Sequence, residues 1–440
     1  MKKALGRWLW IAAVLTAWPA AAEVPTSTPT STPGLLLYDV PRASMIPGTP
    51  GMPGGFHFML NAFAEAQNVG LGAHRIENQG VGGFNGGDTY PLLVDDWAMA
   101  SYRDERGWVE GLLMLDFEPL SIGPAGFPEL GQSGEGLWDA QHAHQLLHQA
   151  MVAVHPLAGL PGWHPESMRE EGPYDLSLFG GQGSATIGPP IFMHRGSSPG
   201  PTVPRKHHKG ENPHETFPVL GASLRLHETW LEASAFSDLE LTPQDSRFYP
   251  HVAPPESFAA RVRQYVDDVL ELQLSAERQR DQGHGEPDAW QVSASAYGWG
   301  WVHGWRLDAL VDWALDAPDP PQGQKGQTAQ ALLGELATRT PSLREVAWLR
   351  SEYNQREEPA SRLGVISSPW LFETLGYEHV VVTQGPSGLQ LGVFGEGTVA
   401  LIPPSLEWFY GTHVAVTLNV GLHVTGMWMT DSSLRPMMHM

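Results

Sequence analysis

The sequence predicts an all-β protein, a transmembrane antiparallel β-barrel of about 16 strands, and the number of segments is compatible with roughly 12–16. Three observations predict this fold. No apolar stretch long enough for a membrane helix follows the first residues. Many stretches of about ten residues alternate apolar and polar side chains, and short turns alternate with long connections, which we expect on one side of the barrel.

The clearest alternation runs from His413 to Val424, near the end of the chain. One face carries Val, Val, Leu, Val, Leu and Val, and the other carries His, Ala, Thr, Asn, Gly and His. Successive side chains of a strand point to opposite faces. An apolar outer face with a small or polar inner face is typical of a strand in a membrane barrel.

Four earlier segments show the same alternation. Their apolar sides hold Val109, Gly111, Leu113, Leu115 and Phe117; Leu220, Ala222, Leu224 and Leu226; Leu270, Leu272, Leu274 and Ala276; and Leu307, Ala309, Val311 and Trp313. Charges on the opposite side need water, which a barrel lumen supplies. We therefore expect inward acids that favour cations, namely Glu110, Asp116, Glu271, Glu277, Asp308 and Asp312.

The connections between these segments fall into two length classes. Tight turns are predicted at Asp104–Gly107, Leu226–Glu228, Tyr265–Asp267, Thr338–Ser342 and Gln384–Gly388. Long connections are predicted at 67–91, 119–141, 183–214, 238–256, 316–326 and 355–368. Short periplasmic turns alternating with long extracellular loops produce this pattern, and an even number of strands would leave both termini in the periplasm.

The ends of the chain suggest export to the cell outer membrane. Residues 1–22 resemble a signal peptide, because Lys2, Lys3 and Arg7 precede an apolar run and a small-residue cleavage site. Residues 23–54 form a Pro/Thr/Ser/Gly-rich linker, 55–428 the predicted barrel, and 429–440 a tail containing Met and His. The chain has no cysteine and a formal charge of −22, which excludes thiolate chemistry and argues against nucleic-acid binding.

Aromatic residues gather near the ends of predicted strands. Examples are Trp299, Trp301 and Trp305, and the run Trp408, Phe409 and Tyr410. Aromatic rings favour the membrane interface because they combine an apolar body with a polar edge. We expect these residues to contribute to interfacial girdles.

Histidine-rich segments are the most distinctive local feature. The candidate side chains for a lumen plug or a metal site are Asp139, His142, His144, His148, His194, Arg195, His207, His208 and His214. His142 and His144 are two residues apart and, on a strand, share a face with each other. A hydrogen-bonded plug that needs no metal is the preferred interpretation of these side chains. The alternative is a copper or zinc site formed by His142, His144 and His194, and the Met-rich tail offers soft copper ligands.

Three of these segments resemble a family of bacterial outer-membrane β-barrel proteins without an assigned activity. The family has QHPHD-, FMHR- and GHHW-like segments; the counterparts here are QHAHQ at 141–145, GPPIFMHR at 188–195 and HHKGENPHET at 207–216. A late LGYE strand at 375–378 also matches. Gln145 and Lys209 depart from the Asp and Trp of the family pattern. The resemblance implies an outer-membrane barrel associated with heavy-metal resistance.

Together these features predict a porin-like channel or transport barrel for small solutes or cations, with a lumen plugged by the 119–141 and 183–214 connections. The expected partners are outer-membrane lipid, the transported solute or cation and, during insertion, the barrel-assembly machinery. No cofactor is required, and copper or zinc is possible under the metal-binding alternative. We predict no enzymatic activity and no catalytic residues. A hydrolase is the second alternative, although Ser184 does not lie in a G-x-S-x-G elbow.

Overall fold

A computed structural model describes 17 segments of the chain. They are 55–73, 86–104, 107–117, 120, 127–134, 137–141, 146–157, 174–183, 185–188, 216–237, 254–266, 269–280, 288–319, 328–342, 344–356, 368–384 and 389–429. No helix among these residues has the length and apolar character required to cross a membrane. Within the described segments, two short helices follow β17, η3 (Pro404–Leu406) and α4 (Glu407–Tyr410).

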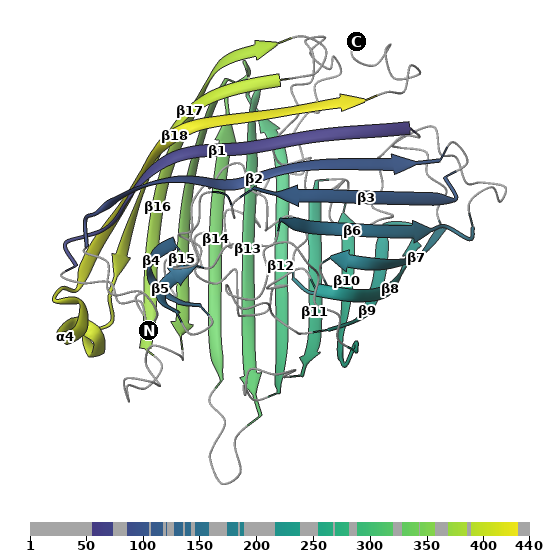
Figure 1. Ribbon diagram of the computed structural model, residues 1–440, viewed down its shortest axis with the longest axis horizontal. Helices are drawn as coiled ribbons and strands as arrows, with labels where there is room; N and C mark the ends of the chain where they lie inside the picture. The colour runs from purple at the N-terminus through teal and green to yellow at the C-terminus, as the bar shows by residue number, and fades with distance from the viewer. Residues whose placement is uncertain are drawn as a thin grey trace.

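Sixteen strands form one closed antiparallel barrel, which confirms the predicted fold and strand number (Figure 1). They are β1 (Gly55–Leu71), β2 (Thr89–Arg103), β3 (Val109–Asp116), β6 (Leu147–Val154), β7 (Tyr174–Gly183), β8 (Thr216–Leu226), β9 (Thr229–Phe236), β10 (Ser257–Val266), β11 (Leu270–Gln279), β12 (Ala289–Val302), β13 (Trp305–Pro318), β14 (Ala329–Arg339), β15 (Glu345–Arg356), β16 (Ser368–Gln384), β17 (Leu389–Leu401) and β18 (Val414–Met429).

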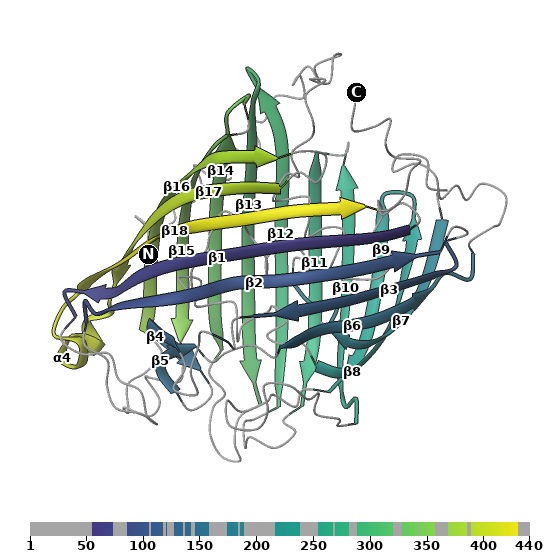
Figure 2. The ribbon, with the colours of Figure 1, turned by 45° about the horizontal axis from the view of Figure 1, so that its top comes forward.

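The barrel closes where β1 pairs with β18, the first strand with the last. Their register runs from His57 opposite Met429 to Leu71 opposite Val416, with one irregularity after Asn68. The wall that contains β1, β2, β3, β6 and β18 crosses in front of β11–β14 at a steep angle, as expected for strongly tilted barrel strands (Figure 2).

The alternation of apolar and polar side chains along each strand decides which of them face inward. In β18, Val420 is 59% exposed on the outside, whereas its neighbour Asn419 is 1% exposed on the inside. In β11, Leu272 and Leu274 are exposed, whereas Gln273 between them is buried. The outer face of the barrel is accordingly aliphatic and aromatic, and the inner face holds most of the polar side chains. This arrangement confirms the predicted alternation in these segments.

Short connections gather at one rim and long ones at the other. β2–β3, β8–β9, β10–β11, β12–β13, β14–β15 and β16–β17 are joined by short links, and the barrel also begins and ends at that rim. The stretch 155–173 between β6 and β7 is an exception, because it is a longer connection at the rim with the short links.

A small separate sheet lies within the connection between β3 and β6. It pairs β4 (Phe127–Gly134) with β5 (Leu137–Gln141), and β4 lies near β1. The sequence predicts 119–141 as a long connection, and this small sheet lies within it. β5 ends at Gln141 and β6 begins at Leu147, and residues 142–145 between them lie outside the described part of the chain.

Several aromatic residues do not join an outer girdle. Trp299 stacks on inward Tyr297, with ring centroids 5.4 Å apart, and Tyr410 is buried against Trp370 in an edge-to-face contact at 5.5 Å. The expected outer placement is therefore wrong for Trp299 and Tyr410. Trp305 and Trp408 are largely exposed, as a girdle requires. The clusters of aromatic residues in the sequence mark the ends of strands, but they do not distinguish the outer face of the barrel from the inner face.

Candidate functional site: the inner wall of the barrel

Carboxylates dominate the charged side chains of the inner wall. Among the buried residues that the structure describes, 13 carboxylates accompany 5 arginines. The carboxylates are Glu65, Glu110, Asp116, Asp175, Glu232, Glu271, Glu277, Asp308, Asp312, Glu335, Glu352, Glu378 and Glu396, and the arginines are Arg261, Arg263, Arg306, Arg339 and Arg350. Such an excess of negative charge within low-dielectric walls creates a potential that attracts cations.

One arginine cluster lies on β9 and β10. Glu232 accepts hydrogen bonds from Arg261 Nε at 2.7 Å and from Arg263 Nε at 2.9 Å. All three side chains are nearly fully buried, and the Arg263 guanidinium lies 5.1 Å from the centroid of the Trp230 ring. Buried charges require such pairing, because an unpaired ion in this environment would be costly.

Two more arginines, Arg306 on β13 and Arg350 on β15, are paired in the same way. Arg306 Nε donates to Asp308 Oδ2 at 3.1 Å, and Tyr297 donates to the same carboxylate at 2.7 Å. Arg350 donates two hydrogen bonds to Glu335 Oε2, at 2.8 and 2.9 Å. Among the described buried side chains the arginines are fewer than the acids, so their pairing leaves this set with an excess of carboxylates.

A histidine links the two strands at the closing seam. His423 on β18 approaches Glu378 on β16 through Nδ1 at 2.8 Å and Asn61 on β1 through Nε2 at 3.0 Å. Its ring stacks on Phe63, with centroids 4.0 Å apart. All four residues are buried. The first and last strands are therefore joined by side chains as well as by the backbone ladder.

A second buried histidine lies just beyond β6, at the rim with the short connections. His155 Nδ1 lies 3.1 Å from Asp175 Oδ2, and its Nε2 lies 3.5 Å from Glu110 Oε2. Burial alone would lower the pKa of His155, but hydrogen bonds and negative charge from Asp175 and Glu110 raise it to about 9. His155 therefore carries a positive charge at neutral pH.

A four-residue segment after β7 lies against the inner wall. Thr186 N donates to Ser234 Oγ on β9 at 3.0 Å, and Gly188 N donates to Ser275 Oγ on β11 at 2.9 Å. Arg261 on β10 donates to the Gly188 carbonyl at 2.8 Å. The described residues 185–188 thus cross three strands inside the barrel, which places the start of the 184–215 connection within the lumen.

The connection between β17 and β18 also turns inward. Ile402, Leu406 and Tyr410 are buried in one cluster with inward residues of four strands. The wall residues of this cluster include Val69, Trp370, Phe372, Ala400 and Ala415. The connection 402–413 therefore covers part of the inner face at the rim with the long connections.

The structure places the predicted lumen acids as follows. Glu110, Asp116, Glu271, Glu277, Asp308 and Asp312 are all buried on the inner wall. His148 Nδ1 lies 3.6 Å from Asp116 Oδ2 on the neighbouring strand. Glu271 lies near Arg263, with an N–O distance of 3.9 Å, and Asp312 accepts a hydrogen bond from Ser293 at 3.1 Å.

Most of the predicted histidine site falls in segments that the structure does not describe. His142, His144, His194, Arg195, His207, His208, His214 and Ser184 lie outside the described residues. Asp139 belongs to β5, and His148 belongs to β6. Within the described part of the chain, no group of three or more His, Asp or Glu side chains is arranged to hold a metal ion. Whether the remaining histidines converge stays a prediction.

The arginine clusters are not among the predicted site residues, although the sequence contains a signal for them. Arg261 and Arg263 are two residues apart in an alternating segment, and that spacing places both on the same face. Their inward direction follows from the aliphatic Val262 between them. Their common partner Glu232 lies about thirty residues earlier in the chain, so only strand pairing brings the three together.

The fold and the inner wall define this chain as a closed sixteen-stranded β-barrel with an aliphatic exterior and an acidic interior.

No family model and no curated protein matches this chain. Similar solved structures include an anion-selective porin from Comamonas acidovorans, with 10% identity, a TM-score of 0.46 and coverage of 85% of this chain and 98% of that one. OprB of Pseudomonas putida has 11% identity, a TM-score of 0.47 and coverage of 85% and 94%. The outer-membrane channel DcaP of Acinetobacter baumannii has 10% identity, a TM-score of 0.47 and coverage of 87% and 100%.

Proposed function

We propose that this protein is an outer-membrane channel for small cations, with a lumen narrowed by connections that fold inward. The excess of buried carboxylates over arginines on the inner wall is the observation that carries the proposal. A cation that enters this lumen would meet a favourable potential at each level, whereas an anion would be repelled.

The outer face supports the membrane location. Leu375 is 66% exposed, and Leu274, Leu349 and Val420 are more than half exposed. Exposed aliphatic side chains around a closed barrel would be unfavourable in water, and lipid is the solvent that suits them. Closure also leaves no unpaired strand edge, which a membrane interior requires.

The inward segments support a narrowed lumen. Residues 185–188 are hydrogen bonded to β9, β10 and β11, and residues 402–410 are packed on inward residues of β16–β18 and β1. Charged wall residues such as Glu352 and Arg350 are almost inaccessible to solvent, whereas a wide aqueous channel would leave such side chains exposed. We therefore expect small conductance and a size limit near that of hydrated ions.

Reversal potentials in planar bilayers test the proposal. In a KCl gradient, the refolded protein should show cation preference, and the double variant Glu277→Gln/Asp312→Asn should reduce that preference at least twofold. Both residues lie on the inner wall, so removal of their charges weakens the lumen potential.

Glu373→Gln is the matched control, because Glu373 lies on the outer face of β16 between Leu371 and exposed Leu375. It removes one carboxylate without changing the lumen and should leave the reversal potential unchanged. Anion preference in the wild type, or an equal effect of the inner and outer variants, would contradict the proposal. So would a folded barrel that conducts no ions.

A further inference from the structure

Four methionines occupy one line of register across neighbouring strands. Met427 on β18 is opposite Met59 on β1, Met59 is opposite Met99 on β2, and Met99 is opposite Met114 on β3. The whole chain has only 14 methionines among 440 residues. The methionine content of the chain does not by itself explain why four methionines lie opposite one another on four consecutive strands.

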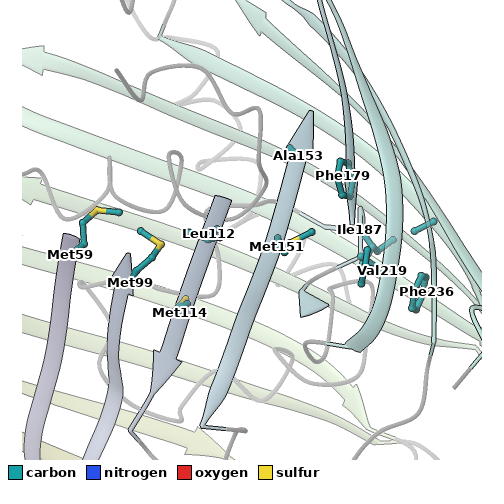
Figure 3. Close-up of a cluster of buried hydrophobic side chains, with 12 residues drawn as sticks. Met59, Met99, Leu112, Met114, Met151, Ala153, Phe179, Ile187, Val219 and Phe236 are labelled. Atoms are coloured by element: carbon teal, nitrogen blue, oxygen red, sulfur yellow. The ribbon is translucent and has the colours of Figure 1, made fainter. Parts of the chain in front are cut away.

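The described side chains of this line face the barrel interior. Met59, Met99 and Met114 are each at most 1% exposed, and all belong to one buried cluster with Met151 of β6 (Figure 3). The side chains of Met59 and Met99 extend from adjacent strands to the same side (Figure 3). The thioethers are therefore concentrated on one part of the inner wall.

Strand geometry allows neighbouring thioethers to meet at a common ion. Paired strands lie about 4.8 Å apart, and a methionine side chain has three rotatable bonds beyond the backbone. Sulfur atoms from adjacent strands can therefore approach one point without a backbone change. Thioethers are soft ligands, which select soft ions such as Cu⁺ over Mg²⁺, Ca²⁺ or Na⁺.

The surroundings of the line suit a monovalent positive charge. Asp116 lies two residues beyond Met114 on the same strand and the same face, with His148 3.6 Å from it. On the other side of the line, Glu110 lies four residues before Met114 and also faces inward. Neutral thioethers would bind the ion directly, and these carboxylates would offset its charge.

We propose that Met59, Met99 and Met114 form a binding site for one soft monovalent metal ion, Cu⁺ or Ag⁺, on the inner wall. The proposal requires the barrel fold but not ion conduction. It also differs from the predicted histidine site, because none of the ligands lies in the histidine-rich segments. A packing role would be served equally well by leucine, which has a similar volume, whereas a metal site requires sulfur.

Silver titration of the full chain, refolded in detergent, tests this assignment. Isothermal titration calorimetry with Ag⁺ should detect saturable binding, and the triple variant Met59→Leu/Met99→Leu/Met114→Leu should weaken it at least tenfold. Variants of the tail, Met437→Leu/Met438→Leu/Met440→Leu, and of the histidine segment, His142→Ala/His144→Ala, should retain the wild-type affinity of the inner site.

Methionine-methyl NMR supplies a second readout that does not depend on the folding of the triple variant. In wild-type protein labelled at the methionine methyl groups, Ag⁺ should shift the signals of Met59, Met99 and Met114, each identified by a single leucine substitution. Equal silver affinity of the wild type and the folded triple variant would overturn the proposal. Shifts confined to other methionines, or loss of binding only in the tail or histidine variant, would also overturn it.

Discussion

At the scale of single residues, Glu373 is a polar side chain on the otherwise apolar outer surface of the barrel. It lies on the outer face of β16 and accepts a hydrogen bond from Ser351 at 2.9 Å. Its neighbours along that face are Leu371 and Leu375. A carboxylate among aliphatic side chains is poorly matched to lipid and retains one polar partner from the adjacent strand.

Replacing this carboxylate should stabilise the barrel in a membrane. Glu373→Leu is expected to raise the free energy of unfolding by on the order of 1 kcal/mol, because an apolar side chain fits the lipid-facing band better. Guanidinium unfolding in liposomes measures the change. Ser351→Ala serves as the control for loss of the hydrogen bond alone. A lower stability of Glu373→Leu would show that this face does not contact lipid.

His155 should make the stability of the barrel depend on pH. Its pKa is about 9 in the folded protein and 6.5 in its ordinary state, so folding favours the protonated imidazole. The resulting stabilisation is fully present below pH 6.5, decreases as the pH rises, and is lost above about pH 9. Its upper limit is about 3 kcal/mol, since one pKa unit corresponds to about 1.4 kcal/mol.

Thermal unfolding in detergent between pH 6 and 10 measures this dependence. The wild type should lose stability across the interval from 6.5 to 9, and His155→Gln should show a flatter profile in the same interval. Identical slopes for the two proteins would mean that the contacts with Asp175 and Glu110 do not hold the proton.

At the scale of elements, the segment 185–188 has a defined attachment to the wall. Its hydrogen bonds to Ser234 on β9 and Ser275 on β11 fix it at two points, on strands separated by β10 and about 40 residues apart in sequence. Each such hydrogen bond contributes about 1 kcal/mol. The position of residues 185–188 on the inner wall therefore depends on side chains of β9 and β11.

Removing both serine hydroxyls should loosen this segment. Ser234→Ala/Ser275→Ala is expected to increase single-channel conductance or its fluctuation, and to lower the unfolding free energy by about 2 kcal/mol. Single-channel recordings measure the change. Ser293→Ala is the matched control, because Ser293 is buried on the same wall but hydrogen bonds Asp312 and not the segment. Unchanged conductance in the double variant would remove the proposed narrowing role.

At the scale of the whole molecule, pairing of β1 with β18 closes the barrel. The alternation of apolar and polar side chains along each strand then gives the barrel two different surfaces. Every barrel strand pairs with two neighbours, so the ladder has no free edge. The outer surface is then determined by one half of the side chains, and the inner surface by the other half. A charge introduced on the outer half should consequently affect insertion of the entire barrel.

Val420→Arg tests this dependence. Val420 is 59% exposed on the outside of β18, the strand that closes the barrel. An arginine near the middle of the lipid-facing band costs about 2–4 kcal/mol, so the yield of folded protein in liposomes should fall. Heat-dependent mobility in gel electrophoresis reports the folded fraction, and Val420→Leu is the control. Equal folding of Val420→Arg and Val420→Leu would contradict a lipid-facing exterior.

The amino-acid sequence by itself determined the class of fold and the facing of many side chains. Alternation in 413–424 and 270–276 was sufficient to separate outward leucine and valine from inward polar residues, because the strand repeat of two residues is a local property. The lengths of the connections likewise predicted two unlike rims. These features depend on neighbours in the chain and can be found without knowledge of strand pairing.

The tertiary structure alone decided the register, and with it every cluster on the inner wall. Met59 and Met427 are opposite one another because the barrel closes, although they lie at opposite ends of the chain. The partners Glu232 and Arg263, and the inward positions of Trp299 and Tyr410, follow from the same pairing and packing. Local alternation specifies a face, but which strand lies beside which, and at what level, depends on contacts between distant segments.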